Sequence, residues 1–294
     1  MLGNFANFGN CSSSGISHAE KALLYRRDME PEQYRSMVDR HIVSADDHKP
    51  YKILSSEDYT ELPFLGFERN VGSVARLKGV DLTPYDHRNE VICTNLSRVW
   101  PDAYILIIIR EPLNWAVSKY DHWYRRDLVD EILEGCLDSL GESYDRLVHR
   151  YIERFGRDHV RVVPYEWLLR DSGKFLKAVT EFIDPGFDSE MPNARMNAAP
   201  PSAGEVEYRR MQYKLKHFKG TGWRKSLMQL ARELQPVSKP YYRLRYGPGP
   251  QRSVVPEETA RRLRPQLAAS NLRLEALTGL SLGELGYDVS QEAV

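Results

Sequence analysis

The sequence predicts an α/β fold in which a doubly wound parallel sheet is flanked by helices. The segment Tyr104–Ile109 is apolar throughout and rich in β-branched residues, which is typical of a strand covered on both faces. A second apolar segment, Val160–Val163, also leads directly into a helical pattern, which runs through residues 168–182. Strands that alternate with helices in this way favour a parallel sheet over an antiparallel one.

The remaining elements follow from the same patterns along the chain. Ser17 followed by Glu20 fits the pattern of a capping box, so we expect a helix from Ser17 onward. Pro31 suits the first turn of a helix over Glu30–Val38. Further strands are expected within the first eight residues and at 51–56. Further helices are expected through 115–123, in parts of 205–234 and at 257–277 up to Gly279, and loops at 9–15, 184–204 and 239–255.

Length and charge limit the function classes. The 294 residues suit one α/β domain, 1–294, whose C-terminal part, 205–294, we expect to be helical and irregular. Lys and Arg number 41 and are balanced by 41 Asp and Glu, which argues against a nucleic-acid partner that is gripped by a basic surface. The 41% of hydrophobic residues is enough for a real core and argues against disorder over the whole length.

Cysteine content and hydropathy predict the compartment. The three cysteines include no C-x-x-C pair, so a disulfide scaffold or structural zinc site is not expected. The longest apolar run, Ala103–Ile109, is too short to span a bilayer, and Met1–Gly15 lacks the features of a signal peptide. We therefore expect a cytoplasmic protein with no membrane span.

Three features at expected strand ends are candidates for binding or catalysis, because ligands of doubly wound sheets gather beyond the carboxyl ends of the strands. The first is a small, hydroxyl-rich segment before a helix, whose backbone N–H groups could hold an anion. A solvated turn with Ser17 as the helix N-cap is the alternative. The residues of this segment are Ser12, Ser13, Ser14, Gly15, Ile16 and Ser17.

The second feature pairs Arg110, at the end of the most apolar strand, with Ser118 in the following helix. A guanidinium and a hydroxyl that converge on one point can bind a phosphate through charge-assisted hydrogen bonds. The alternative is an Arg110 that pairs with Glu111 or a buried acid and a Ser118 that only packs. The pair taken alone leaves both interpretations open.

The third feature is Glu57, which follows the expected strand at 51–56. A carboxylate there could act as a general base, or it could simply face the positive end of a helix dipole. The eight histidines show no H-E-x-x-H spacing, so no metal site is expected. The sequence also lacks G-x-G-x-x-G, G-x-x-x-x-G-K-[ST] and G-x-S-x-G, which argues against a dinucleotide-binding oxidoreductase, a P-loop kinase and a serine hydrolase.

The segment Trp100–Tyr120 reads WPDAYILIIIREPLNWAVSKY. It resembles the 3′-phosphate signature of sulfotransferases that use PAPS (3′-phosphoadenosine 5′-phosphosulfate), and Arg110 and Ser118 match its two phosphate-holding residues. The segment Val162–Leu168 is similar to a later strand and helix of the family, and the tail from Ser270 to Tyr287 resembles the end of bacterial members. The resemblance implies a P-loop-like α/β domain that binds a nucleotide.

The family's phosphosulfate loop corresponds to Ser13–Ser17, but Ser13 stands where the family has Lys or Arg. The resemblance therefore implies either impaired catalysis or another cation, for which Lys21, Lys49 and Lys52 are the candidates. Glu57 resembles the general base of carbohydrate-type members, and His122 and His48 are the alternatives. Lys219 and Gly220 faintly resemble a late basic segment that covers the nucleotide.

The resemblance implies direct in-line transfer of a sulfuryl group from PAPS to a hydroxyl of a carbohydrate or small-molecule metabolite, without a metal. Glu57 would take the acceptor's proton, and the Ser12–Ser17 segment would hold the departing nucleotide. A nucleotide-binding protein of the same fold that has lost catalysis is the alternative. The identity of the acceptor and the oligomeric state are left open by the sequence.

Overall fold

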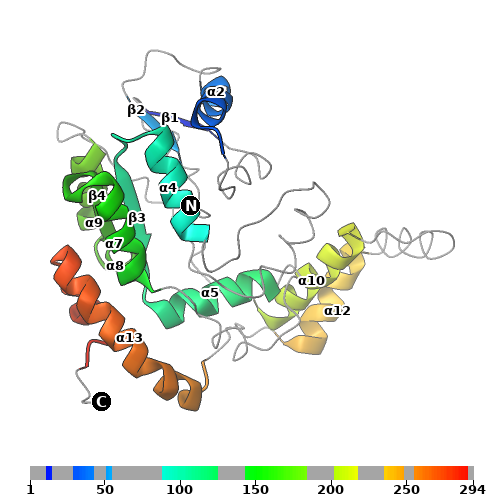
Figure 1. Cartoon of the computed structure of the whole chain (residues 1–294). Coiled ribbons are helices and arrows are strands. Elements are labelled where there is room, and N and C mark those ends of the chain that lie inside the picture. The colour runs from blue at the N-terminus through cyan, green and yellow to red at the C-terminus, as the bar shows by residue number, and fades with distance from the viewer. Residues whose placement is uncertain are drawn as a thin grey trace.

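The computed structural model describes residues 11–14, 29–42, 51–54, 88–124, 143–183, 202–217, 235–247 and 255–290 (Figure 1). Its strands are β1 (Cys11–Ser14), β2 (Tyr51–Leu54), β3 (Ile105–Ile109) and β4 (Val160–Pro164). Its α-helices are α2 (Pro31–Ile42), α4 (Arg88–Val99), α5 (Pro112–Tyr124), α7 (Tyr144–Phe155), α8 (Tyr165–Arg170), α9 (Ser172–Ile183), α10 (Ala203–His217), α12 (Gln235–Tyr246) and α13 (Glu257–Thr278). Two short 3₁₀ helices are η6 (Arg157–His159) and η7 (Gly283–Leu285).

The four described strands form parallel pairs. β1 pairs with β2, from Cys11 opposite Tyr51 to Ser14 opposite Leu54. β3 pairs with β4, from Ile105 opposite Val160 to Ile109 opposite Pro164. The expected parallel pairing is confirmed, but these strands make two separate pairs and not one continuous sheet.

The β3–β4 pair is covered on both faces, as its unbroken apolar sequence predicts. Ile107 and Ile109 are fully buried in a core that also contains side chains of α4 and α7. Leu106 and Ile108 point the other way and pack with Val163 and the apolar face of α9. Successive side chains of a strand alternate between its faces, so a strand buried on both sides must be apolar at every position.

Helix α7 lies between the β3–β4 pair and α13 and contributes to the core on both sides (Figure 1). Leu147 and Tyr151 of α7 and Leu274 of α13 are buried in the same cluster. α13 ends where the sequence predicts, because Gly279 takes the left-handed conformation (φ 71°) and donates its N–H to the carbonyl of Glu275. None of the described helices is both long and apolar enough to cross a membrane.

Three sequence-based expectations about elements were wrong. Ser12–Ser14 belong to β1 and not to a loop, since pairing with β2 satisfies their backbone. The expected loop at 239–255 begins as helix α12, which continues past Pro240 because it packs against α10, with the Tyr208 and Tyr242 rings 6.1 Å apart. The expected helix through 168–182 is interrupted at Asp171 and forms α8 and α9. The strand expected within the first eight residues and the start of the helix from Ser17 lie outside the described residues.

We predict that Ile107→Ala lowers the free energy of unfolding by about 2–5 kcal/mol, because it opens a cavity at a fully buried position. Leu244→Ala on α12 is the matched control, since Leu244 is 90% exposed and its loss should cost no more than about 0.5 kcal/mol. Urea denaturation followed by circular dichroism measures both. Equal costs for the two variants would contradict the assigned core.

Candidate functional site

The candidate site lies at the carboxyl ends of β3 and β4. Arg110 directly follows β3, and Tyr165 directly follows Pro164, the last residue of β4. Ile109 is opposite Pro164 in the parallel register, so the two following residues emerge at the same edge. The half-buried Arg110 guanidinium lies 5.2 Å from the centre of the Tyr165 ring, a cation–π contact that limits its freedom.

Glu111 caps the start of α5. Its carboxylate accepts hydrogen bonds from the backbone N–H groups of Leu113 (3.1 Å) and Asn114 (2.7 Å). Burial raises the pKa of Glu111, and the nearby Glu166 carboxylate adds to the rise, whereas these two backbone bonds and Arg110 oppose it. Since Glu111 occupies these two N–H groups, they are not open to a bound anion.

A buried carboxylate ties this turn to the C-terminal segment. Glu166, at the start of α8, is 8% exposed and accepts a hydrogen bond from the Glu111 backbone N–H at 3.0 Å. Its other oxygen accepts a hydrogen bond from the buried Tyr287 hydroxyl at 2.9 Å. Burial raises the pKa of Tyr287 and of Tyr144, whose hydroxyl hydrogen-bonds with the Arg110 backbone, so both phenols stay neutral.

Of these residues, Arg110 alone is predicted by the sequence to have a role in binding. The sequence analysis includes Glu166 only as part of the segment Val162–Leu168 and Tyr287 only as part of the tail, without a role for either residue. The available signal for Glu166 was an acid two residues after a buried strand, whose neighbouring strand is followed by Arg-Glu. Nothing in the sequence indicates that Tyr287, 121 residues further on, contacts Glu166.

Ser118 is exposed and is the seventh residue of α5, so it lies on the element that begins beside Arg110. His122 lies one helical turn further along, and its backbone alone is described. Arg110 and Ser118 thus belong to consecutive elements at one edge of the β3–β4 pair.

The other candidates belong to the N-terminal strand pair or lie outside the described residues. The backbone of Ser12, Ser13 and Ser14 is in β1, and Lys52 of β2 is the register partner of Ser12. The remaining candidates, for which the structure gives no placement, are Gly15, Ile16, Ser17, Lys21, His48, Lys49, Glu57, Lys219 and Gly220.

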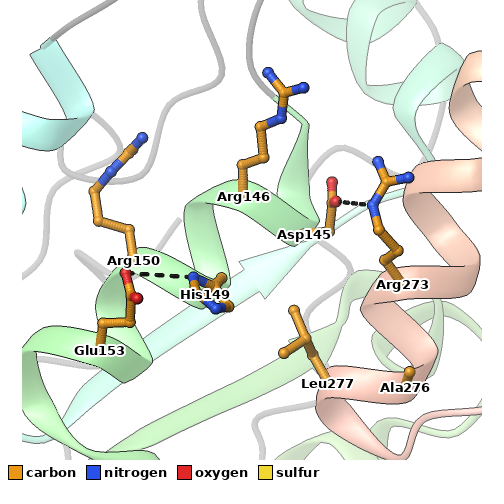
Figure 2. A pocket seen from close by; sticks show the side chains of 8 residues that line it. All are labelled: Asp145, Arg146, His149, Arg150, Glu153, Arg273, Ala276 and Leu277. Atoms are coloured by element: carbon orange, nitrogen blue, oxygen red, sulfur yellow. Dashed lines mark hydrogen bonds and ion pairs between the residues drawn. The ribbon is translucent and has the colours of Figure 1, made fainter.

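A pocket with a volume of about 480 Å³ lies between α7 and α13 (Figure 2). Asp145 points toward α13 and binds Arg273 at 2.5 Å, and His149 lies 3.3 Å from Glu153 on α7. These charges are paired within the protein. We therefore read the pocket as a packing feature of the two helices.

Asp145 is the polar anchor between α7 and α13. Its carboxylate is buried and accepts hydrogen bonds from Ser143, Ser270 (2.6 Å) and Arg273 (2.5 Å). Burial alone would raise the pKa of Asp145, but the bonds from these three residues outweigh it and hold the pKa below the ordinary value of 3.8. The bonds thus favour the ionised form.

The chemistry available at the β3–β4 edge is the binding of an anion. Arg110 supplies a permanently charged donor that lies against the Tyr165 ring, and Ser118 supplies an exposed hydroxyl on the following helix. Among the described residues, no cluster of His, Cys, Asp and Glu could hold a metal ion.

The model of the sulfotransferase family matches residues 20–189, more than half of the chain. A sulfotransferase from Alicyclobacillus acidocaldarius has a similar fold, with a TM-score of 0.55 and 14% sequence identity over 95% of this chain and 90% of that one. No curated protein matches the sequence significantly.

We predict that Asp145→Asn lowers the free energy of unfolding at pH 7 by about 1–3 kcal/mol, because it weakens charge-assisted hydrogen bonds to a buried group. The folded-state pKa of Asp145 is depressed, so its contribution is present above pH 3.8 and is lost as the pH falls through the folded value. The difference between the wild type and Asp145→Asn should therefore shrink below about pH 4 in urea titrations. Glu153→Gln, at an exposed pair, is the control. A difference that stays constant from pH 7 to pH 3 would exclude the assigned ionisation.

Proposed function

The chain belongs to the sulfotransferase family, and from this premise we propose that it transfers a sulfuryl group from PAPS to an acceptor hydroxyl. The observation that carries the proposal is the half-buried Arg110 guanidinium, held on the Tyr165 ring at the carboxyl edge of β3 and β4. Ligands of parallel α/β folds bind at this edge. A carbohydrate or a small-molecule metabolite is the proposed class of acceptor.

Arg110 and Ser118 are the proposed ligands of the nucleotide's 3′-phosphate. Their hydrogen-bond donors suit a phosphate group, since a guanidinium presents paired N–H groups to phosphate oxygens and Ser118 adds a hydroxyl. The start of α5 cannot share this task, because Glu111 takes its N–H groups. Arg110 would therefore set the register of the nucleotide at a distance from the reacting sulfur.

The phosphosulfate group is proposed to lie beyond β1, where backbone N–H groups of Gly15, Ile16 and Ser17 follow the strand. Ser13 lacks the positive charge that the family places there. Lys52 is the candidate cation that the register supports, because it is the backbone partner of Ser12, next to Ser13. Lys219 and Gly220 are proposed to contribute from the later part of the chain.

In the proposed reaction, Glu57 accepts the proton of the acceptor hydroxyl as its oxygen attacks sulfur. The new O–S bond forms as the bond from sulfur to the 5′-phosphate oxygen breaks, and adenosine 3′,5′-bisphosphate leaves with that electron pair. Positioning of donor and acceptor and fixed positive groups supply most of the rate, as in phosphoryl transfer. His122 is the alternative base.

We predict that Arg110→Ala raises the dissociation constant of adenosine 3′,5′-bisphosphate by about ten- to a hundredfold, because a charge-assisted hydrogen-bond donor is lost. Isothermal titration calorimetry measures this. Arg161→Ala removes an exposed arginine of β4 that lies against Phe182 and should leave the affinity unchanged within about twofold. The dissociation constant of Arg110→Lys should lie between those of the wild type and Arg110→Ala, since lysine keeps the charge but not the planar guanidinium. Unaltered affinity in Arg110→Ala would refute the assigned role.

We predict that Glu57→Gln lowers kcat for sulfuryl transfer by about 10²- to 10⁴-fold, the usual contribution of a general base, while the nucleotide still binds. The assay follows transfer from PAPS to a panel of carbohydrate and metabolite hydroxyls by mass spectrometry. The same loss in His122→Ala, with normal turnover in Glu57→Gln, would assign the base to His122. Nucleotide binding by the wild type without transfer to any acceptor would favour the catalytically impaired alternative.

A further inference from the structure

We infer that Tyr287, acting through Glu166, is a positioning residue for the turn that presents Arg110 to the nucleotide. The inference rests on the proposed function for the identity of the ligand. It assigns to the C-terminal segment, which lies beyond the region matched by the family, a part in building the donor site.

The contact chain is continuous from the tail to the turn. The Tyr287 hydroxyl donates to one oxygen of the Glu166 carboxylate at 2.9 Å. The other oxygen accepts the backbone N–H of Glu111 at 3.0 Å. Glu111 is bonded covalently to Arg110, so the chain ends on the peptide unit that carries the candidate phosphate ligand.

Because Glu166 and Tyr287 are buried, the loss of either hydrogen bond should disturb the turn. Glu166 is 8% exposed and Tyr287 is 3% exposed, so water cannot readily replace either partner. Without Tyr287, the buried Glu166 carboxylate would lose a hydrogen bond and would gain freedom to turn away from Glu111. The turn would then keep the strand register, which ends at Ile109 opposite Pro164, and the hydrogen bond between Tyr144 and the Arg110 backbone, but it would lose its link to α8.

The segment that carries Tyr287 is itself fixed against the body of the protein. Arg170, the last residue of α8, donates to the carbonyls of Glu284 (2.7 Å) and Leu285 (3.0 Å). The amide of Asn271 on α13 donates to the Asp288 carbonyl at 2.8 Å. Tyr287 is thus bracketed by anchors on both sides, and its hydroxyl is held at Glu166.

The test compares Tyr287→Phe with Thr180→Val in the full-length protein. Each substitution deletes one buried hydroxyl, but that of Thr180 donates to the Lys177 carbonyl on α9, away from the turn. In Tyr287→Phe we expect the dissociation constant of adenosine 3′,5′-bisphosphate and the KM for PAPS to rise about three- to tenfold, with kcat changed by less than about twofold. Thr180→Val should alter neither constant by more than about twofold.

A conservative pair at Glu166 separates positioning from packing. Glu166→Gln retains a carbonyl oxygen for the Glu111 N–H, whereas Glu166→Ala removes the acceptor altogether. The loss of nucleotide affinity should therefore be clearly smaller in Glu166→Gln than in Glu166→Ala. Equal losses in the two variants would overturn the proposed route through the Glu111 N–H.

Hydrogen exchange of the nucleotide-free protein distinguishes failure of this inference from failure of the proposed function. The Glu111 amide should exchange faster in Tyr287→Phe than in the wild type and Thr180→Val. If the Glu111 amide of Tyr287→Phe exchanges at the wild-type rate and the nucleotide affinity of this variant is unchanged, the positioning role is overturned. If the wild type does not bind the nucleotide but the Glu111 amide is deprotected in Tyr287→Phe, the positioning role stands and the proposed ligand is wrong.

Discussion

Burial of the β3–β4 pair on both of its faces is the constraint on which the described structure depends. Ile107 and Ile109 are excluded from water by α4 and α7, and Val163 is excluded by α9. Each fully buried aliphatic side chain contributes about 1.5–3 kcal/mol, and together they fix the register of the two strands. The register in turn fixes which residues emerge together at the carboxyl edge, so the position of Arg110 beside Tyr165 is a consequence of core packing.

Two carboxylates lie close to this edge, and the protein satisfies each in a different way. Glu111 uses the N–H groups at the start of α5, where the helix dipole also favours negative charge. Glu166 is more deeply buried and depends on one backbone N–H and one phenol. Both acids are thus satisfied mainly by backbone N–H groups and a phenol, and through these bonds they orient the backbone around Arg110.

The sequence was informative where a single physical signal dominates. The unbroken apolar run of β3 can only be stable between two layers, and a glycine after a long amphipathic pattern ends α13 at Gly279. Prediction failed where tertiary contacts override local preference. Pro240 suggests a loop, but packing against α10 keeps α12 helical. The small polar residues of β1 suggest a turn, but they form a strand because they pair with β2.

The candidate site also has one part that was predictable from the sequence and one part that was not. Arg110 was predictable because its place at the end of β3 is local in sequence. The link between Glu166 and Tyr287 was not, since it joins residues 121 positions apart and depends on how the tail folds back over α8. Side-chain contacts of this range follow from the packed fold and leave no periodic pattern in the sequence.

Cys93 gives the core an internal reporter. Its thiol is fully buried on α4, with the sulfur 3.7 Å from the Arg150 carbonyl of α7. An alkylating reagent can reach this sulfur only when α4 and α7 come apart. Its modification rate, resolved by mass spectrometry of the Cys93 peptide, therefore measures how often this helical layer opens in the native protein.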